Sequence, residues 1–405
     1  MSWPKVRLKD ICDLQNGYAF KSSDYVDDSN TLSCRMSNIR PGGVFDIDYN
    51  ARYLPDDFAD KYSQFLLKDG DVIIAMTDLA DAPKILGVPT VVGTEGRNVL
   101  LNQRVGKLVI KDSQRVHFPY LKLALNYPKV RSVYKRFAGG GLQINLGKND
   151  LLSVEIPLPP LEEQKRIAAI LDKADSVRRK RQQAIDLADD FLRSVFLDMF
   201  GDPILNPKGL PQVKLTELSD VISGYAFKSA EYIDDGEDSV RLCRGANTLT
   251  GYFDWKDTVY WNKEKLAGIQ NYKIKSGDVI LAMDRPWISS GLKVCVFPEN
   301  ERDTYLVQRV ARIRPKNPKY TDFLYASILS KAFEKHCCPT ETTVPHISPV
   351  ELKNFNVLVP DEKLVEKYHD AVVKVRKSKL AMQKSAVEAS NAFNSLSQKS
   401  FAGEL

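Results

Sequence analysis

Six side chains of this sequence have hydrogen-bonding groups that suit the edges of nucleic-acid bases or phosphate groups. An arginine guanidinium donates in a fork to guanine or phosphate, and a carboxamide both donates to and accepts from adenine. All six lie in segments where two related halves of the chain differ. We therefore predict that these residues contact DNA: Arg97, Arg136, Gln143, Asn145, Arg285 and Arg302.

The divergent segments occur in pairs, one member in each half of the chain. Residues that both halves share are expected to hold the fold or to contact phosphate, which carries no sequence information. Side chains that distinguish two half-sites are expected where the halves differ, at residues 37–43, 77–98, 135–148, 245–251, 284–305 and 335–348.

The shared pentapeptide Tyr-Ala-Phe-Lys-Ser occurs at residues 18–22 and again at 225–229. It combines aromatic rings with a cation and a hydroxyl, so Lys21 and Lys228 are further candidates for contacts with phosphate. The alternative is that the aromatic residues belong to the core and the lysines are simply solvated.

The sequence contains no complete motif of a catalytic site. Gly147 and Lys148 resemble the end of a phosphate-binding loop, but Leu142 stands where that loop needs its first glycine. The sequence also lacks the glycine-rich cofactor loop and the Asn/Asp-Pro-Pro-aromatic tetrad of an amino-methyltransferase. We therefore predict no catalytic and no cofactor-binding residues in this chain.

One cluster has the residue types of a metal site: His336, Cys337, Cys338 and His346. Two adjacent ligands suit a tetrahedral ion poorly, and the first half has no equivalent cluster. We predict no metal site.

Bulk properties restrict the class of protein. The 405 residues suffice for two or three domains, and the net charge of +6 permits a nucleic-acid partner without requiring one. No apolar run approaches the ~18–20 residues that span a bilayer, and the N-terminus has no signal-like core. Six cysteines in a chain of this length do not resemble a disulfide framework, so we expect a cytoplasmic protein without membrane contact.

The chain contains an internal repeat. Residues 6–28 match residues 213–235 without a gap, at an offset of 207 (213 − 6). The match resumes in three places, 34–38 with 243–247, 70–76 with 277–283 and 103–105 with 308–310. We infer a tandem duplication of one globular domain followed by one long helix.

Each repeat ends in a long segment with apolar residues at alternating three- and four-residue spacing. The segment 161–199 contains no Gly or Pro, and the same pattern recurs near the C-terminus at an offset of 201. A narrow heptad seam favours one partner helix, so we predict that the two helices pack on each other. The alternative is two amphipathic helices on separate domains. The seam includes Ile167, Leu171, Ala174, Ile185, Leu192, Val372, Val375, Met382 and Phe393.

The run 178–181 forms a basic collar on the first helix, and Arg179 and Lys180 are its candidate DNA contacts. We expect the equivalent run, 374–379, to lie at the same level of an antiparallel pair. The collar would then attract phosphates between two half-sites. The alternative is a solvated surface offset by nearby aspartates.

These patterns predict an α+β fold with two similar mixed α/β domains separated by two long antiparallel coiled-coil helices in a pseudo-two-fold tandem repeat. The expected boundaries are 1–158, 159–200, 201–359 and 360–405. Strands are expected at 71–76, 88–92, 105–110, 154–158, 278–283, 294–297, 310–313 and 355–359, and short helices at 119–126 and 321–331.

The chain resembles the DNA specificity subunits of type I restriction-modification systems. The matching features are GYAFKS in both halves, the two GDVI strands, IPLPPLEEQKRIAAILDKAD, MFGDP and the terminal FAGEL. The resemblance implies two target-recognition domains that each read half of a split double-stranded DNA site, with the helices as a ruler. It also implies two methyltransferase subunits that use S-adenosylmethionine to modify adenine. Motor-nuclease subunits that use ATP and Mg²⁺ complete the implied complex.

The second linker departs from the family pattern. Residues 360–365 read PDEKLV where residues 159–164 read PPLEEQ. Two other classes of protein remain open from the residues themselves. One is a diverged DNA methyltransferase or nuclease with its own catalysis, and the other is a coiled-coil adaptor that does not bind DNA.

Overall fold

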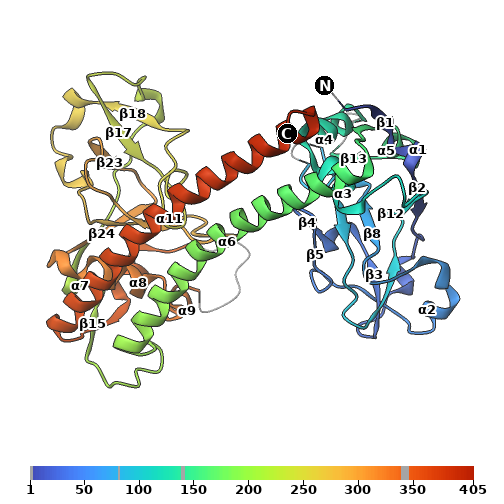
Figure 1. Ribbon diagram of the computed structural model, residues 1–405. Coiled ribbons are helices and arrows are strands. Elements are labelled where there is room, and N and C mark those ends of the chain that lie inside the picture. The colour runs from blue at the N-terminus through green and yellow to red at the C-terminus, as the bar shows by residue number, and fades with distance from the viewer. Residues whose placement is uncertain (1–2, 81–82, 138–141, 339–345) are drawn as a thin grey trace. The chain divides into compact units, whose positions relative to one another are not determined.

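The computed structural model describes residues 3–80, 83–137, 142–338 and 346–405 (Figure 1). It divides into two compact units. Unit 1 comprises Met1–Arg181 and Ser385–Leu405, and unit 2 comprises Gln182–Lys384. The long helices α6 (Leu161–Phe200) and α11 (Glu362–Ala402) run through both units, so each unit combines a globular part with a stretch of both helices.

The globular part of unit 1 is built from short strands and short helices. Its helices are α1 (Leu8–Ile11), α2 (Phe58–Lys61), α3 (Phe118–Asn126), α4 (Pro128–Tyr134) and α5 (Lys148–Leu152). Its strands are β1 (Lys5–Arg7), β2 (Cys12–Asn16), β3 (Thr31–Cys34), β4 (Ile39–Arg40), β5 (Val44–Phe45), β6 (Tyr53–Leu54), β7 (Leu66–Leu67), β8 (Val72–Ala75), β9 (Thr77–Leu79), β10 (Pro89–Val91), β11 (Asn98–Leu101), β12 (Val105–Ile110), β13 (Gln143–Asn145) and β14 (Glu155–Pro157).

Unit 2 repeats much of this plan. Its helices are α7 (Leu215–Leu218), α8 (Thr321–Ile328), α9 (Lys331–Cys337) and α10 (Pro349–Asn354). Its strands are β15 (Gln212–Lys214), β16 (Ser219–Ser223), β17 (Ser239–Cys243), β18 (Val259–Asn262), β19 (Val279–Ala282), β20 (Trp287–Ile288), β21 (Gly291–Leu292), β22 (Val294–Val296), β23 (Thr304–Leu306), β24 (Val310–Pro315) and β25 (Asn356–Leu358).

The sheets of the two units share one topology. The antiparallel sheet β10-β8-β12-β2 of unit 1 corresponds to β22-β19-β24-β16 of unit 2. The second sheet, β6-β3-β11-β7, corresponds to the three strands β18-β17-β23, which lack an equivalent of β7. The pair β3–β11 and its equivalent β17–β23 are both parallel. The duplication seen in the sequence is therefore a duplication of the fold.

Strand β8 explains why the GDVI segments are nearly continuous apolar runs. Val72, Ile74 and Met76 enter the core that packs against the helices, whereas Ile73 and Ala75 enter the core facing the second sheet. Side chains of a strand alternate between its faces, and here both faces are covered. In unit 2, β19 is divided in the same way between two clusters.

The shared GYAFKS motif is held by close backbone contact. A Cβ atom on Gly17 would lie 2.2 Å from the carbonyl oxygen of Asn102, and one on Gly224 would lie 2.2 Å from that of Val307. Only glycine permits this approach. Tyr18 N–H then donates to the carbonyl of Leu101 at 2.8 Å, which ties the motif to β11.

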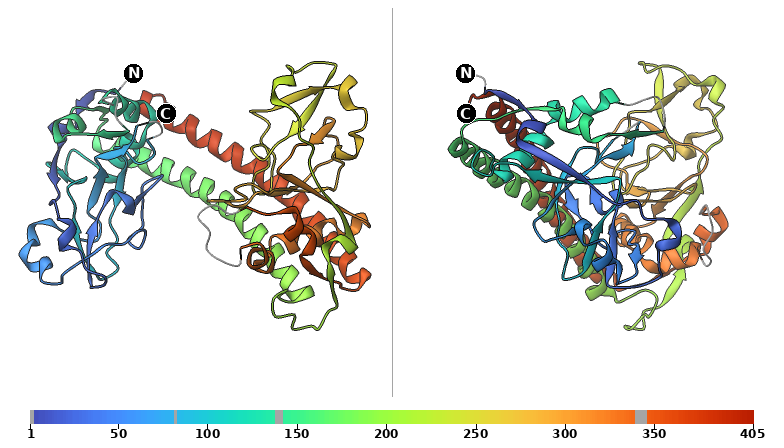
Figure 2. Two further views of the ribbon diagram at one scale, coloured as in Figure 1. Left: turned by 180° about the vertical axis from the view of Figure 1, so that it is seen from behind. Right: turned by 90° about the vertical axis from the view of Figure 1, so that its right-hand side faces the viewer.

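The portions of the long helices within unit 1 run antiparallel. The Arg166 guanidinium donates to the carbonyl of Leu405 at 3.2 Å, and that of Arg178 lies 5.4 Å from the ring centroid of Phe393. The last turns of α11 lie beside α3 and α4 (Figure 1). Both views of Figure 2 place them next to the start of the chain, where the Trp3 indole donates to the Ser400 carbonyl at 2.7 Å.

The portions within unit 2 are also antiparallel and carry an aromatic core. Phe200 is fully buried, with ring-centroid distances of 4.9 Å to Phe323 and 5.4 Å to Tyr368. Further along the pair, Lys379 Nζ donates to both carboxylate oxygens of Asp189 at 2.6 Å. Lys379 is a basic residue within the apolar spacing of α11, and its charge is thus neutralised by the partner helix.

Truncating this aromatic core should destabilise unit 2 strongly. We expect Phe200→Ala to lower the free energy of unfolding of unit 2 by about 3–5 kcal/mol, because it leaves a cavity beside the remaining rings. Three of the four tryptophans, Trp255, Trp261 and Trp287, lie in unit 2, so denaturant unfolding followed by fluorescence monitors this unit. The control on the same helix is Phe191→Ala, an exposed position where we expect a change within about 0.5 kcal/mol. Equal destabilisation by both substitutions would contradict this packing.

Most sequence predictions of elements are confirmed. Every predicted strand matches an observed strand within one or two residues at each end, and the predicted helix 119–126 is α3. The predicted helix 321–331 is wrong at its C-terminus, because α8 ends at Ile328. Ser330 then caps a new helix, α9, by accepting a hydrogen bond from the N–H of Phe333.

The expectation that the two basic runs share one level of the helix pair is wrong. Residues 178–181 belong to unit 1, where Arg178 faces Phe393, whereas residues 374–379 belong to unit 2, where Lys379 faces Asp189. In an antiparallel pair one residue number rises as the other falls, so two equivalent positions meet only at the centre of the pair.

Three further observations concern the described part of the chain. None of its helices is long and apolar enough to cross a membrane. All six cysteines fall within it and are free. No group of three or more His, Cys, Asp or Glu side chains in it is arranged to hold a metal ion. His336 instead hydrogen-bonds through Nε2 to the Glu351 carbonyl at 2.9 Å.

Candidate nucleic-acid interface

In unit 1, the methionine that directly follows β8 links three chain segments. Met76 N–H donates to the carbonyl of Arg104 at 3.0 Å, and Leu146 N–H donates to the Met76 carbonyl at 2.7 Å. These segments are far apart in sequence, yet the backbone bonds fix them side by side. The side chains that follow Met76, that of Arg104 and those that precede Leu146 are therefore presented together.

Unit 2 has the same backbone framework. Met283 N–H donates to the carbonyl of Arg309 at 2.9 Å, and Ile347 N–H donates to the Met283 carbonyl at 2.9 Å. Arg309 is the repeat equivalent of Arg104, and both follow a glutamine in the shared Gln-Arg-Val tripeptide. One frame is thus built twice, once in each unit.

Different side chains occupy this frame in unit 1. Strand β13 pairs with β9, and Ile144 points into the core, so Gln143 and Asn145 share the exposed face. The Thr77 hydroxyl donates to Asn145 Oδ1 at 2.9 Å, and Arg104 Nη1 donates to Gln143 Oε1 at 3.3 Å. We call Thr77, Arg104, Gln143 and Asn145 the unit 1 cluster.

The corresponding side chains of unit 2 are charged. Arg309 Nη1 donates to Asp284 Oδ2 at 2.9 Å, and His346 Nδ1 lies 3.6 Å from Asp284 Oδ1. The Arg309 guanidinium holds the pKa of Asp284 below its usual range, so this side chain is a carboxylate that only accepts hydrogen bonds. Arg285 is exposed beside it. We call Asp284, Arg285, Arg309 and His346 the unit 2 cluster.

Comparisons with known proteins give this geometry a context. Residues 2–187 match the family model described as the type I restriction modification DNA specificity domain. The type I restriction enzyme MjaVIII specificity subunit of Methanocaldococcus jannaschii is 25% identical over 334 residues, which cover 77% of this chain and 74% of that protein. The EcoAI specificity subunit of Escherichia coli is 26% identical over 297 residues, which cover 70% of this chain and 47% of that protein.

The matched family domain covers the globular part of the first repeat and ends within α6, and the second half of the chain repeats its sequence and topology. The first repeat thus contains the DNA specificity domain of type I restriction-modification systems, and the chain is similar to their specificity subunits along most of its length. Solved structures agree at the level of the fold. An S subunit from M. genitalium aligns with a TM-score of 0.54 and 14% identity, covering 99% of this chain and 96% of that one. A chain from a type I R-M system, in a structure that concerns complex assembly and conformational transition, aligns with a TM-score of 0.54 and 18% identity over 100% and 98%.

Of the residues predicted to contact DNA, the fold brings three into the two clusters: Gln143, Asn145 and Arg285. The two arginines at the centre of the clusters were not among the residues predicted from the sequence. Arg104 and Arg309 are shared by both halves, and shared residues were assigned to the fold or to phosphate. The shared Gln-Arg-Val tripeptide places both arginines at the same position of the repeat, and this match was the signal in the sequence that could have found them. His346 was considered only as a metal ligand.

Arg97 and Arg302 lie apart from the clusters and have internal partners. Arg97 pairs with Asp48 at 2.8 Å and with Glu95 at 3.2 Å, and its hydrogen bond to Asp48 raises the pKa of the guanidinium. Arg302 pairs with Asp235, donates to the Ser239 carbonyl at 3.1 Å and lies 5.0 Å from the centroid of a tyrosine ring. These contacts order the surface loops around both arginines.

The lysines of the shared pentapeptide are exposed, and the aromatic residues divide between surface and core. Phe20 and Phe227 are buried, as the structural alternative requires, whereas the two tyrosines are partly exposed. Lys228 Nζ lies 3.8 Å from a Glu231 carboxylate oxygen at the surface. The motif also supports the backbone next to Arg104 of the unit 1 cluster, because Gln103 N–H donates to the Tyr18 carbonyl at 3.0 Å. Lys21 is exposed on the same loop.

The remaining candidates lie elsewhere on unit 1. Arg136 is exposed and lines a groove of about 1050 Å³ together with Lys5 and Arg7 of β1. On α6, Arg179 Nε pairs with Asp175 at 3.1 Å, and Lys180 is exposed. The collar is therefore partly neutralised by its own helix.

The loops of the other divergent segments are organised by an asparagine that both halves share. Asn38 Oδ1 accepts from the N–H of Arg35 at 2.8 Å, and its amide donates to the carbonyls of Asp46 and Ile47 at 3.0 and 3.2 Å. Asn247 makes the equivalent bond to Arg244 N–H at 3.1 Å. The loop sequences differ while the side chain that fixes them is the same. Residues 81–82, 138–141 and 339–345 of the candidate segments lie outside the described residues.

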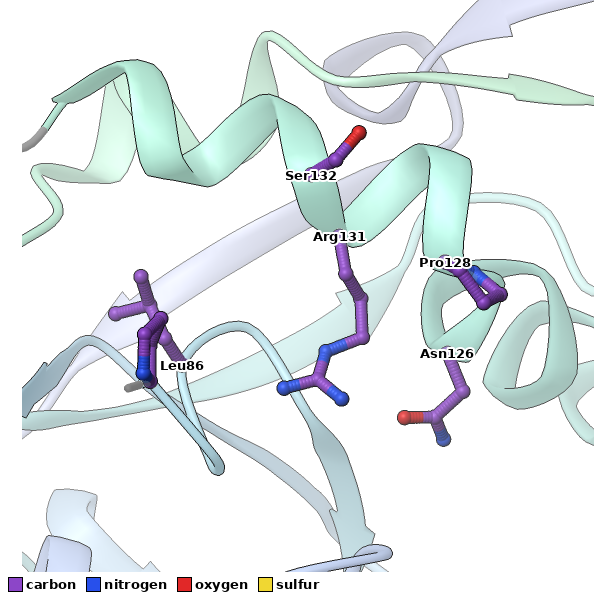
Figure 3. Close-up of a pocket in the computed structure, with 6 residues that line it drawn as sticks. Leu86, Asn126, Pro128, Arg131 and Ser132 are labelled. Atoms are coloured by element: carbon purple, nitrogen blue, oxygen red, sulfur yellow. The ribbon is translucent and has the colours of Figure 1, made fainter. Parts of the chain in front are cut away.

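A cavity of about 220 Å³ in unit 1 lies beside the loop that follows β9 (Figure 3). Arg131 extends from α4 toward the loop that carries Leu86, and its Nη2 donates to the Lys84 carbonyl at 2.9 Å. The buried carboxylate of Asp78 accepts from the N–H groups of Ile85 and Leu86 at 2.6 and 3.0 Å. These hydrogen bonds hold the loop in place. The residues that form them do not combine a nucleophilic side chain with an adjacent base.

Proposed function

We propose that each unit of this specificity subunit reads one half of a split double-stranded DNA site. The observation that carries the proposal is the duplicated frame around Met76 and Met283, which presents polar side chains of different chemistry at equivalent positions. A shared scaffold with divergent exposed groups suits recognition of two different sequences through one docking geometry.

The proposal includes partner subunits. The chain itself is non-catalytic, and two methyltransferase subunits modify adenine with S-adenosylmethionine while motor-nuclease subunits use ATP and Mg²⁺ in the cytoplasm. This division is supported by the absence of a glycine-rich cofactor loop and of a methyltransferase tetrad from the sequence. Large apolar residues remain exposed on both long helices, and such side chains suit partner helices. They include Leu187 and Phe191 on α6 and Leu380 and Val387 on α11.

The two helix starts differ in a way that bears on these partners. Gln164 is fully buried near the start of α6, where it donates to the carbonyls of Arg115 and Pro159 and accepts from His117 N–H. Its repeat equivalent, Val365, is fully buried in an apolar cluster. We infer that the two methyltransferase contacts are similar but not identical.

The direct test is adenine methylation across the genome of the host. Cells that contain the complete system should carry one bipartite adenine motif, and that motif should disappear when the gene for this chain is deleted and return with the intact gene. Purified full-length chain should not transfer methyl groups to DNA by itself. A motif that persists without the chain, or methyl transfer by the chain alone, would overturn the proposal.

Charge reversal on the collar tests whether α6 contacts DNA between the half-sites. We expect Arg179→Glu with Lys180→Glu to weaken binding uniformly across sequences. It should also reduce the slope of log affinity against log salt by about 0.9 for each phosphate that the collar no longer binds. The control is Arg193→Glu, an exposed position of the same helix in unit 2. If the double variant has the same slope of log affinity against log salt as the wild type, the collar does not contact DNA and is an ordinary solvated surface.

A further inference from the structure

We propose that the unit 1 and unit 2 clusters are the specificity-determining sites of the two units, with preferences for different base pairs. The proposal rests on the proposed function and adds which side chains read bases and what they select. It follows from four observations: a common backbone frame, different side chains on it, the exposure of those side chains other than the buried Thr77, and their distinct hydrogen-bonding chemistry.

The unit 1 cluster has the chemistry to select an A·T pair. Thr77 is buried and fixes Asn145 through its hydroxyl, so Thr77 is a positioning residue. The Asn145 oxygen retains a second lone pair and its amide retains its donors, which is the pattern that pairs with adenine N6 and N7. Gln143 is held in the same manner by Arg104.

An apolar side chain completes this face. Leu79 pairs with Gln143 across the β9–β13 ladder and is 60% exposed. A large aliphatic residue that exposed has no role in the core of unit 1, but it suits contact with a thymine methyl group. Carboxamides and an aliphatic side chain on one surface match the two members of an A·T pair.

The unit 2 cluster has the chemistry to select a G·C pair. Its two guanidinium groups, Arg285 and Arg309, suit guanine O6 and N7. The Asp284 carboxylate accepts hydrogen bonds, so it suits the N4 donor of cytosine, and it opposes the approach of phosphate. The backbone at Arg285 and Arg309 has φ angles of +45° and +64°, a left-handed region that non-glycine residues adopt at some cost. That conformation sets the direction of both side chains.

The contacts within the clusters add little to the stability of the fold, so stability does not explain why these side chains are present. In the Arg309–Asp284 pair the side chains are 69% and 42% exposed. Exposed ion pairs contribute about 0–1 kcal/mol, so the fold does not require this pair. The buried framework of Met76 and Met283 would persist with other residues at the surface positions.

The test converts the carboxamides of unit 1 to carboxylates of the same shape, Gln143→Glu with Asn145→Asp. The complex that contains the variant chain is used to select bound duplexes from a pool with randomised half-sites. Both positions are exposed, so thermal unfolding should match the wild type. We expect the preference for adenine at one or two positions of one half-site to fall roughly 5- to 150-fold, because a carboxylate cannot donate to adenine N7. The other half-site should not change.

A reciprocal variant and a control complete the design. Arg285→Gln with Arg309→Gln should alter only the other half-site, by weakening selection for guanine. Arg97→Gln, which removes an arginine outside the clusters, should leave both half-sites intact. Unchanged selection in both double variants would overturn the proposal, as would a weakening that is uniform across all sequences, since that identifies phosphate contacts. If the wild-type complex selects no bipartite site, the proposed function itself has failed.

Discussion

Inserting one heptad after Gln182 and a second after Gln383 is expected to increase the preferred spacing between the two half-sites by about three base pairs. The two positions are equivalent at the offset of 201, and both lie where the long helices pass from one unit to the other. A seven-residue insertion keeps the apolar seam in phase, so the helix pair should still form. Each helix gains about 10 Å at ~1.5 Å per residue, against about 3.4 Å for each base pair.

The longer spacer carries a penalty. Three additional base pairs rotate one half-site by about 100° around the DNA axis, so either one unit must reorient or the duplex must twist. We therefore expect weaker binding at the new spacing than the wild type shows at its own. Methylation at the original spacing should be nearly abolished.

The measurement is methylation of a plasmid library with constant half-sites and varied spacers. The matched control inserts a single heptad in α6, which leaves unpaired helical residues and should reduce methylation at every spacing. A folded double-insertion variant that retains the original spacing would mean that the helices do not set the distance.

The sequence predicted the architecture because its signals were periodic and duplicated. The strand β8 is a run of apolar residues after a Gly-Asp turn, and its equivalent β19 follows the same turn. The long helices were equally clear, since a heptad pattern without Gly or Pro over so many residues has few alternatives. Both signals are local, and they can be read without knowing the fold.

The clusters could not be predicted because they are not local. Thr77, Arg104 and Asn145 come together only through the β9–β13 ladder and the backbone bonds to Met76. The register of such long-range pairs is not encoded in the neighbouring sequence. The repeat also hides Arg104 as a candidate. Base-reading residues were expected to differ between the halves, but Arg104 and Arg309 are identical and only the side chains around them differ.

Other candidates failed for a related reason. Arg97 and Arg302 have the side chain of a DNA contact, but each is paired with an aspartate that lies far away in sequence. Asp48 and Asp235 reach them only after the loops fold. The basic residues of the divergent segments therefore include arginines that pair within the protein and arginines that are available to DNA. The sequence alone does not distinguish the two kinds.

Exchange of unit 1 is expected to change one half-site completely while the other is retained. A chimera that takes residues 1–181 and 385–405 from a related specificity subunit should methylate a hybrid site at close to the wild-type rate. The reason is that this exchange moves every internal contact of unit 1 together. It includes the Phe401 ring, which lies 4.8 Å from that of Tyr127, and the three hydrogen bonds of Gln164.

The control chimera exchanges only residues 1–158 and shows why the boundary matters. Its new globular part would meet the old helix surfaces, where Trp3 bonds to the Ser400 carbonyl and Gln164 bonds to Arg115. We expect the same hybrid site, but with a lower free energy of unfolding for unit 1, by about 1–3 kcal/mol, because the buried surfaces no longer match. Methylation profiling and denaturant unfolding measure the two effects separately.

The two chimeras together distinguish where specificity lies from where stability lies. If recognition belongs to the globular part alone, both chimeras share one hybrid site and differ only in stability. A change in the half-site read by unit 2 in either chimera would mean that the units do not recognise DNA independently. If the larger chimera reads a different half-site from the smaller one, the helix segments 159–181 and 385–405 take part in recognition. The collar at Arg179 and Lys180 would then be the first place to look for the contact.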